Sequence, residues 1–113
     1  MQVLAILILV TNVFAGPSVT DGIRKKINEH MAELKKNCSP EALKLENKLT
    51  GKVTIKWSID DEGTASQAVV DEKKTTLKNA AVHNCIIDLI YGWKFPPAPQ
   101  GQSVSAVLPF TFN

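Results

Sequence analysis

The chain has 113 residues, the length of one domain, with 44% hydrophobic and 21% charged residues, a composition that excludes a disordered chain. Thirteen Lys and Arg against eleven Asp and Glu leave a net charge of +2, too small an excess for a dedicated nucleic-acid binder. Two cysteines allow one disulfide but no four-cysteine zinc site.

The first predicted element is a leader. Residues 3–10 are an unbroken apolar run, too short for a bilayer span of about 20 residues but typical of a signal peptide. Val13, Phe14 and Ala15 form an acceptable cleavage site. We therefore predict a signal peptide at residues 1–15, a single domain at residues 16–113 without a transmembrane anchor after cleavage, and a periplasmic or secreted location. A retained short anchor and a cytosolic apolar tail are the alternatives.

Two helical segments follow. Thr20 or Asp21 is a suitable N-cap for the first helix. Residues of the inward face then recur at helical spacing, at Ile23, Ile27, His30 or Met31, Leu34 and Cys38. Ser39 can serve as the cap and Pro40 as the first residue of a second short helix over residues 41–48. A helical continuation after a kink is the alternative, and Leu43 and Leu49 are expected to point inward.

A β-hairpin comes next. Apolar residues alternate with polar ones over residues 52–60, as in a half-buried strand. Asp60, Asp61, Glu62 and Gly63 form the turn, with Gly63 able to take a positive φ. Residues 64–71 return as an edge strand, with Ser66, Ala68 and Val70 on one face.

The last two elements are a helix and a strand. Asn79 is the expected N-cap of the helix, and Gly92 ends it. One amphipathic stripe runs along this helix, through Val82, Cys85, Ile86, Leu89, Ile90 and Trp93. Residues 103–112 alternate as a strand, in which Pro109 cannot donate a ladder hydrogen bond and so indicates an edge or a bulge.

These elements predict an α+β fold, a small two-layer sandwich. A three-stranded, mostly antiparallel sheet has helices on one face, and residues 53–59 form its central strand. Five aromatic residues are expected in the core rather than around a ligand, namely Trp57, Trp93, Phe95, Phe110 and Phe112.

The two cysteines lie on the apolar faces of the first and last predicted helices. If both faces pack on one sheet, the sulfurs of Cys38 and Cys85 can meet, and an exported chain enters a compartment where a disulfide persists. Two buried free thiols are the alternative. A metal site at His83 and Cys85 is disfavoured because residues i and i+2 of a helix point apart, and a nucleophilic Cys85 is disfavoured by its apolar stripe.

An ordered set of motifs covers residues 23–113. It comprises His30-x-x-Glu33-Leu34-x-x-x-Cys38, Glu41-x-Leu43, Leu49-x-Gly51-Lys52-Val53, Ile59-x-x-x-Gly63, Asn79, Cys85, Trp93-x-Phe95-Pro96-x-x-Pro99 and Leu108-Pro109-Phe110-x-Phe112. This set resembles the C-terminal domain of the AgmX/PglI family of bacterial envelope proteins, a relative of the TonB C-terminal domain.

The resemblance matches Cys38 and Cys85 to the paired cysteines of that family. Two positions depart from the family pattern: Ser39 stands where an aromatic residue is frequent, and Asn47 where proline is frequent. Family members usually carry this domain at the end of a longer protein with an inner-membrane anchor. A short leader precedes it here, so energy transduction by this chain alone is not expected.

The resemblance implies a non-catalytic binding or adaptor module of the envelope, linked to transport or gliding-motility machinery. Domains of this kind bind a protein or peptide segment by strand addition. The expected edge is the last strand, at Ser103, Ser105, Val107, Pro109 and Thr111. In a competing interpretation, Pro109 only protects this edge from aggregation. No cofactor, metal or nucleic-acid partner is expected, and the oligomeric state stays open.

Two other functions remain as alternatives. The first is an orphan structural copy of the domain that competes with full-length relatives. The second is a small secreted enzyme. The chain has two histidines and one tyrosine, and it shows no Ser–His–Asp pattern, metal-ligand spacing or glycine-rich phosphate loop. The acidic cluster at residues 60–62 could imitate a carboxylate site, but solvated residues are usual at a hairpin tip.

Overall fold

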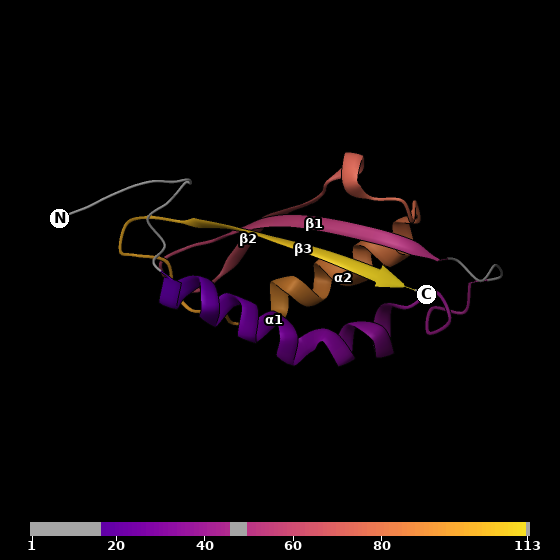
Figure 1. Ribbon diagram of the computed structural model, residues 1–113, viewed down its shortest axis with the longest axis horizontal. Helices are drawn as coiled ribbons and strands as arrows, with labels where there is room; N and C mark the ends of the chain where they lie inside the picture. Colours follow the sequence, from indigo (N-terminus) through magenta and orange to yellow (C-terminus); the bar gives the residue numbers. More distant parts are fainter. Residues whose placement is uncertain (1–16, 46–49, 113) are drawn as a thin grey trace.

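The computed structural model describes residues 17–45 and 50–112, and the predicted signal peptide lies outside them. The elements in chain order are α1 (Pro17–Cys38), β1 (Gly51–Ile59), β2 (Ala65–Val70), the 3-10 helix η1 (Glu72–Lys74), α2 (Ala80–Gly92) and β3 (Val104–Phe112). The strands form one sheet in the order β2-β1-β3, antiparallel at both pairings. Figure 1 shows α1 and α2 on one side of the sheet and η1 on the other. The predicted α+β sandwich with a central β1 is confirmed.

The core lies between the sheet and the two helices. Alternate residues of β1 and β3 face the helices, and α2 contributes one stripe. These buried residues are Val53, Ile55, Trp57, Ile59, Ala106, Leu108, Phe110, Phe112, Val82, Ile86 and Ile90. All five aromatic residues expected in the core are at most 5% exposed, as predicted. Each large apolar side chain buried in this way stabilises the fold by about 1.5–3 kcal/mol.

Polar hydrogen bonds anchor η1 to the face of the sheet that the helices leave free. Thr54 is 1% exposed although it lies on that face. Its backbone N–H donates to Thr75 Oγ1 at 3.0 Å, and its hydroxyl donates to the carbonyl of Lys74 at 3.3 Å. The N–H of Asp71 donates to the Thr54 carbonyl at 2.8 Å. Both backbone groups of Thr54 are therefore paired away from β3.

The segment after α1 differs from the prediction. Residues 41–44 form a turn rather than the start of a helix, and residues 46–49, including Leu49, lie outside the described part of the chain. Ser39 acts as the expected cap, since its Oγ accepts from the N–H of Ala42 at 3.0 Å. Lys44 has a φ of 56°, a left-handed conformation that ends the turn. Leu43 packs partly buried against the core, as expected.

The predicted N-caps of the two long helices have different outcomes. α1 begins at Pro17, so Thr20 and Asp21 lie inside the helix and the predicted N-cap is wrong; proline is well tolerated in a first turn. In α2 the prediction is confirmed, because Asn79 Oδ1 accepts from the N–H of Val82 at 3.1 Å. Neither α1 nor α2 combines the length and hydrophobicity that a bilayer-crossing helix needs.

Candidate functional site

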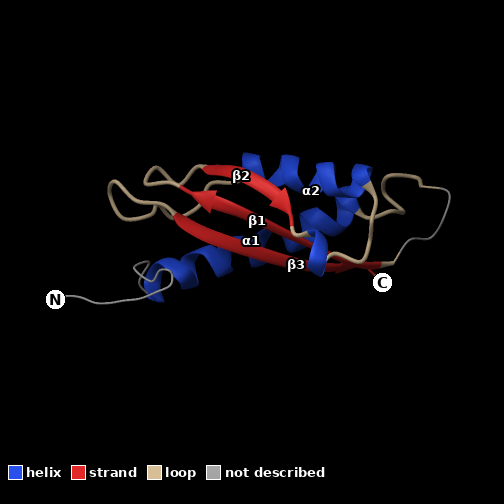
Figure 2. Ribbon diagram, turned by 90° about the horizontal axis from the view of Figure 1, so that it is seen from above, coloured by secondary structure: helices blue, strands red, loops and turns tan. Residues whose placement is uncertain are grey.

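β3 forms one edge of the sheet, and this is the strand predicted to bind a partner. Viewed from above, β3 and β2 lie at opposite edges with β1 between them (Figure 2). All five predicted residues are exposed: Ser103, just before the strand, and Ser105, Val107, Pro109 and Thr111 within it. Val107 is 49% exposed, which is unusual for a large apolar side chain in this domain.

The register with β1 shows which backbone groups of β3 face outward. Pro109 stands opposite Thr54, and Thr111 stands opposite Lys52. Lys52, like Thr54, uses its backbone on the other side: its N–H donates to Thr76 Oγ1 at 2.8 Å, and its carbonyl accepts from the N–H of Thr76. The pairs Thr54–Pro109 and Lys52–Thr111 are therefore non-hydrogen-bonded pairs of the antiparallel β1–β3 ladder, and such pairs alternate with hydrogen-bonded ones. The backbone groups of Ser105, Val107, Pro109 and Thr111 thus point away from β1.

This outward row is an incomplete ladder. Ser105, Val107 and Thr111 each present an N–H and a carbonyl, whereas Pro109 presents only its carbonyl. Within residues 17–45 and 50–112 none of these groups hydrogen-bonds another part of the chain. Pro109 occupies an outward position, so it costs the internal β1–β3 ladder nothing, as expected for proline in an edge strand.

The opposite edge of the sheet, formed by β2, is interrupted by a bulge. The register of β2 shifts between Lys56 and Ser58, and Gln67 takes a φ of 55°, so β2 carries a bulge. The bulge places Ala65, Ala68 and Val70 toward the core and Ser66 outward, which corrects the expectation that Ser66 shares a face with Ala68. The N–H of Ala68 donates to the hydroxyl of Tyr91 on α2 at 3.0 Å. Bulges and satisfied N–H groups prevent strand pairing.

A groove between α1 and β3 lies next to the open edge. It has a volume of about 320 Å³. Its lining residues are Ile23, Arg24 and Ile27 of α1 and Val104 to Pro109 of β3. The contribution of α1 was not predicted from the sequence, because helical periodicity shows which residues face inward but not which strand they meet. The amphipathic spacing of Ile23 and Ile27 is the one sequence signal for this groove.

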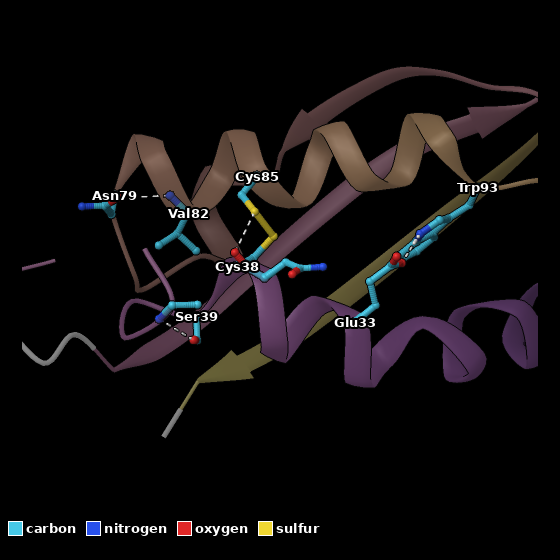
Figure 3. The surroundings of a disulfide bond; sticks show 9 residues. Glu33, Cys38, Ser39, Asn79, Val82, Cys85 and Trp93 are labelled. Atoms are coloured by element: carbon cyan, nitrogen blue, oxygen red, sulfur yellow. Dashed lines mark hydrogen bonds between the residues drawn. A yellow bond between two sulfur atoms is a disulfide. The ribbon is translucent and has the colours of Figure 1, made fainter. Parts of the chain in front are cut away.

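A disulfide joins the two helices on the same side of the sheet. Cys38 at the end of α1 and Cys85 on α2 are bonded, with a Cα–Cα distance of 5.5 Å (Figure 3). The predicted pairing is therefore present. Because the Cys85 sulfur is bonded, it is unavailable as a thiolate ligand or nucleophile. Among the described residues no group of three or more His, Cys, Asp and Glu side chains is arranged to hold a metal ion.

A second link between α1 and the end of α2 involves Glu33. Its Oε1 accepts from Trp93 Nε1 at 3.0 Å and lies 3.0 Å from His30 Nδ1. The His30 ring stacks on Trp93 with 4.5 Å between ring centroids. Figure 3 shows the Glu33 side chain reaching from α1 to the Trp93 indole. This contact gives the buried indole N–H its partner and holds α1 in position beside the sheet.

The acidic cluster at the hairpin tip has a structural role. Asp60 Oδ1 accepts from the N–H of Glu62 at 2.8 Å and of Thr64 at 3.0 Å. Asp61 Oδ2 accepts from the N–H of Gly101 at 2.8 Å. Hydrogen bonds from the Thr64 and Glu62 backbones, with a smaller contribution from the charge of Lys94, lower the pKa of Asp60 below its ordinary value. These carboxylates therefore shape the turn and tie it to the segment before β3.

The comparisons with known proteins concern the fold. No family model and no curated protein matches the sequence. Among solved structures the chain is similar to the NMR solution structure of the Helicobacter pylori TonB C-terminal domain, with 20% identity and a TM-score of 0.57 over 87% of this chain and 86% of that one. The chain thus has the fold of a TonB C-terminal domain. Membership of the AgmX/PglI family stays a prediction.

Proposed function

We propose that this protein is a non-catalytic binding or adaptor module of the bacterial cell envelope that engages an extended segment of a partner protein at β3. The observation that carries the proposal is the asymmetry of the sheet. The β2 edge is bulged and its Ala68 N–H is bonded to Tyr91, whereas the β3 edge presents a row of backbone groups that no other described residue pairs, beside a groove. An added strand would complete the ladder of β3.

Three further features support this setting. The predicted signal peptide would export the chain to the periplasm, where a disulfide such as Cys38–Cys85 persists. The fold is that of the TonB C-terminal domain. The motif resemblance to AgmX/PglI domains supports a role in envelope transport or gliding-motility machinery. The proposal therefore names an envelope protein as the partner class.

The test is a pull-down from the periplasm and the detergent-solubilised envelope of the cells that produce the protein. The bait is the full chain with a C-terminal tag, expressed with its own leader. In a second bait, Val107→Pro removes an outward N–H without touching the β1–β3 hydrogen bonds. In the matched control, Val107→Thr retains that N–H and a β-branched side chain.

We expect the unchanged chain and Val107→Thr to capture the same envelope protein, and Val107→Pro to lose it. Circular dichroism and a thermal melt establish that each bait is folded. Equal capture by all three baits would show that the partner binds elsewhere. The absence of any specific partner would contradict the adaptor function and favour the orphan structural copy.

A further inference from the structure

The groove between α1 and β3 is lined by the same stretch of β3 that carries the outward backbone groups. The outward groups of Ser105, Val107 and Pro109 lie within the stretch of β3 that lines the groove. A strand bound to this edge would lie about 4.8 Å from β3, and its alternate side chains would point to the helix side of the sheet. Those side chains would enter the space next to Ile23 and Ile27.

The shape of the groove favours an apolar side chain at its centre. On the helix side of β3, Ala106 stands between Val104 and Leu108. Because its side chain is only a methyl group, it leaves more space in the groove than its two larger neighbours. Ile23 and Ile27 form the opposite wall, one helical turn apart, and both pack partly buried against the core. A valine, isoleucine or leucine of a bound strand would remove apolar surface of both walls from water.

The charge of the groove comes from Arg24. Its side chain is 69% exposed, and its guanidinium lies 3.7 Å from the Asp21 carboxylate, in a loose and solvent-exposed ion pair that contributes little. Among the described residues that line the groove, Arg24 is the one that carries a charge. Its planar fork of donors fits a carboxylate in bidentate geometry.

The spacing of these features defines a pattern for the ligand. Arg24 lies three residues, or about 4.5 Å of helical rise, from Ile27, and its long side chain can extend this distance toward the roughly 6.6 Å that separates residues i and i+2 on the same face of a strand. We infer that the groove selects an extended protein segment with an apolar residue and, two positions away on the same face, an aspartate or glutamate. This inference rests on the proposed strand addition at β3 and names the class of segment that the edge accepts.

The test uses a phage-displayed library of random nine-residue peptides, selected against the tagged full chain purified after export. We expect enriched peptides to carry the apolar-x-acidic pattern. Selection against the Arg24→Glu chain should enrich Lys or Arg at the acidic position. The matched control is Lys25→Glu, which makes the same charge change at an exposed α1 residue outside the groove lining.

Affinities of one enriched peptide then separate the two proposals. We expect Arg24→Glu to weaken its binding about fivefold or more, Lys25→Glu to change it less than twofold, and Val107→Pro to abolish it. If Arg24→Glu binds with unchanged affinity while Val107→Pro abolishes binding, the groove pattern is wrong and edge pairing stands. If Val107→Pro binds equally well, or no peptide is enriched, both proposals fail.

Discussion

At the scale of single residues, the carboxylate of Asp60 is expected to make the stability of the fold depend on pH. This carboxylate accepts two backbone N–H groups, from Thr64 and Glu62, and these bonds favour the charged form and lower the pKa in the folded state. A group with a lowered folded pKa stabilises the fold above its unfolded pKa, about 3.9 for Asp. That stabilisation is lost as the pH falls through the folded pKa.

The substitution Asp60→Asn tests this linkage. The Asn amide oxygen can still accept both hydrogen bonds, but it carries no charge at any pH. We expect the difference in melting temperature between the unchanged chain and Asp60→Asn to be largest at pH 6 and to shrink as the pH falls to 2. Thermal melts by circular dichroism at several pH values measure it. Asp88→Asn, the same substitution at an exposed position of α2, is the matched control.

At the scale of elements, the two edge strands of the sheet differ in their regularity and in the hydrogen bonding of their outward backbone groups. β2 has a bulge at Gln67, and its Ala68 N–H is bonded to Tyr91 of α2. β3 is regular over nine residues, and its outward backbone groups have no partner among the described residues. Edge strands of folded proteins are normally protected from further pairing. The open β3 is therefore the edge at which we propose that a partner segment binds.

The protection of β2 can be tested with Tyr91→Phe. This substitution removes the hydroxyl that accepts from the N–H of Ala68, and it keeps the ring. We expect amide hydrogen exchange at Ala68 to rise about fivefold, the equivalent of a hydrogen bond worth about 1 kcal/mol. NMR exchange measurements on both chains provide the comparison. Exchange at Val69, which pairs with Lys56, should stay the same, and unchanged protection of Ala68 would contradict the role of Tyr91.

At the scale of the whole molecule, the disulfide is the largest single constraint. It spans 47 residues and joins α1 to α2, so that α1, which supplies one wall of the groove, is covalently fixed to the rest of the domain. The chain-entropy model gives about 4 kcal/mol for a loop of this length. Domains of this size are stable by about 5–15 kcal/mol in total.

Removing both cysteines should therefore weaken the fold strongly. We expect the double substitution Cys38→Ala and Cys85→Ala to lower the free energy of unfolding by about 3–4 kcal/mol, measured by urea denaturation. Alanine is suitable because Cys38 is fully buried. Reduction of the unchanged chain with dithiothreitol should give a similar loss. A loss below about 1 kcal/mol would show that packing alone holds α1 in place.

Much of the fold could be predicted from local signals. The alternation of β1, the turn with Gly63, the Asn79 cap and Pro109 at an outward edge position each depend on neighbouring residues in the chain. The turn at residues 41–44 was missed because the left-handed Lys44 carries no strong signal in its residue type. The bulge at Gln67 was missed for the same reason.

The sequence by itself determined the elements and their inward faces, because helical and strand periods are properties of the chain and need no partner. It also determined that β3 can serve as an edge, since proline lacks an N–H wherever it stands. Only the tertiary structure decided which edge is open and what stands beside it. The hydrogen bond between Tyr91 and Ala68 joins residues 23 positions apart, and the groove is lined by Arg24 and Ala106, which are 82 positions apart. Such arrangements exist only once the helices pack on the sheet.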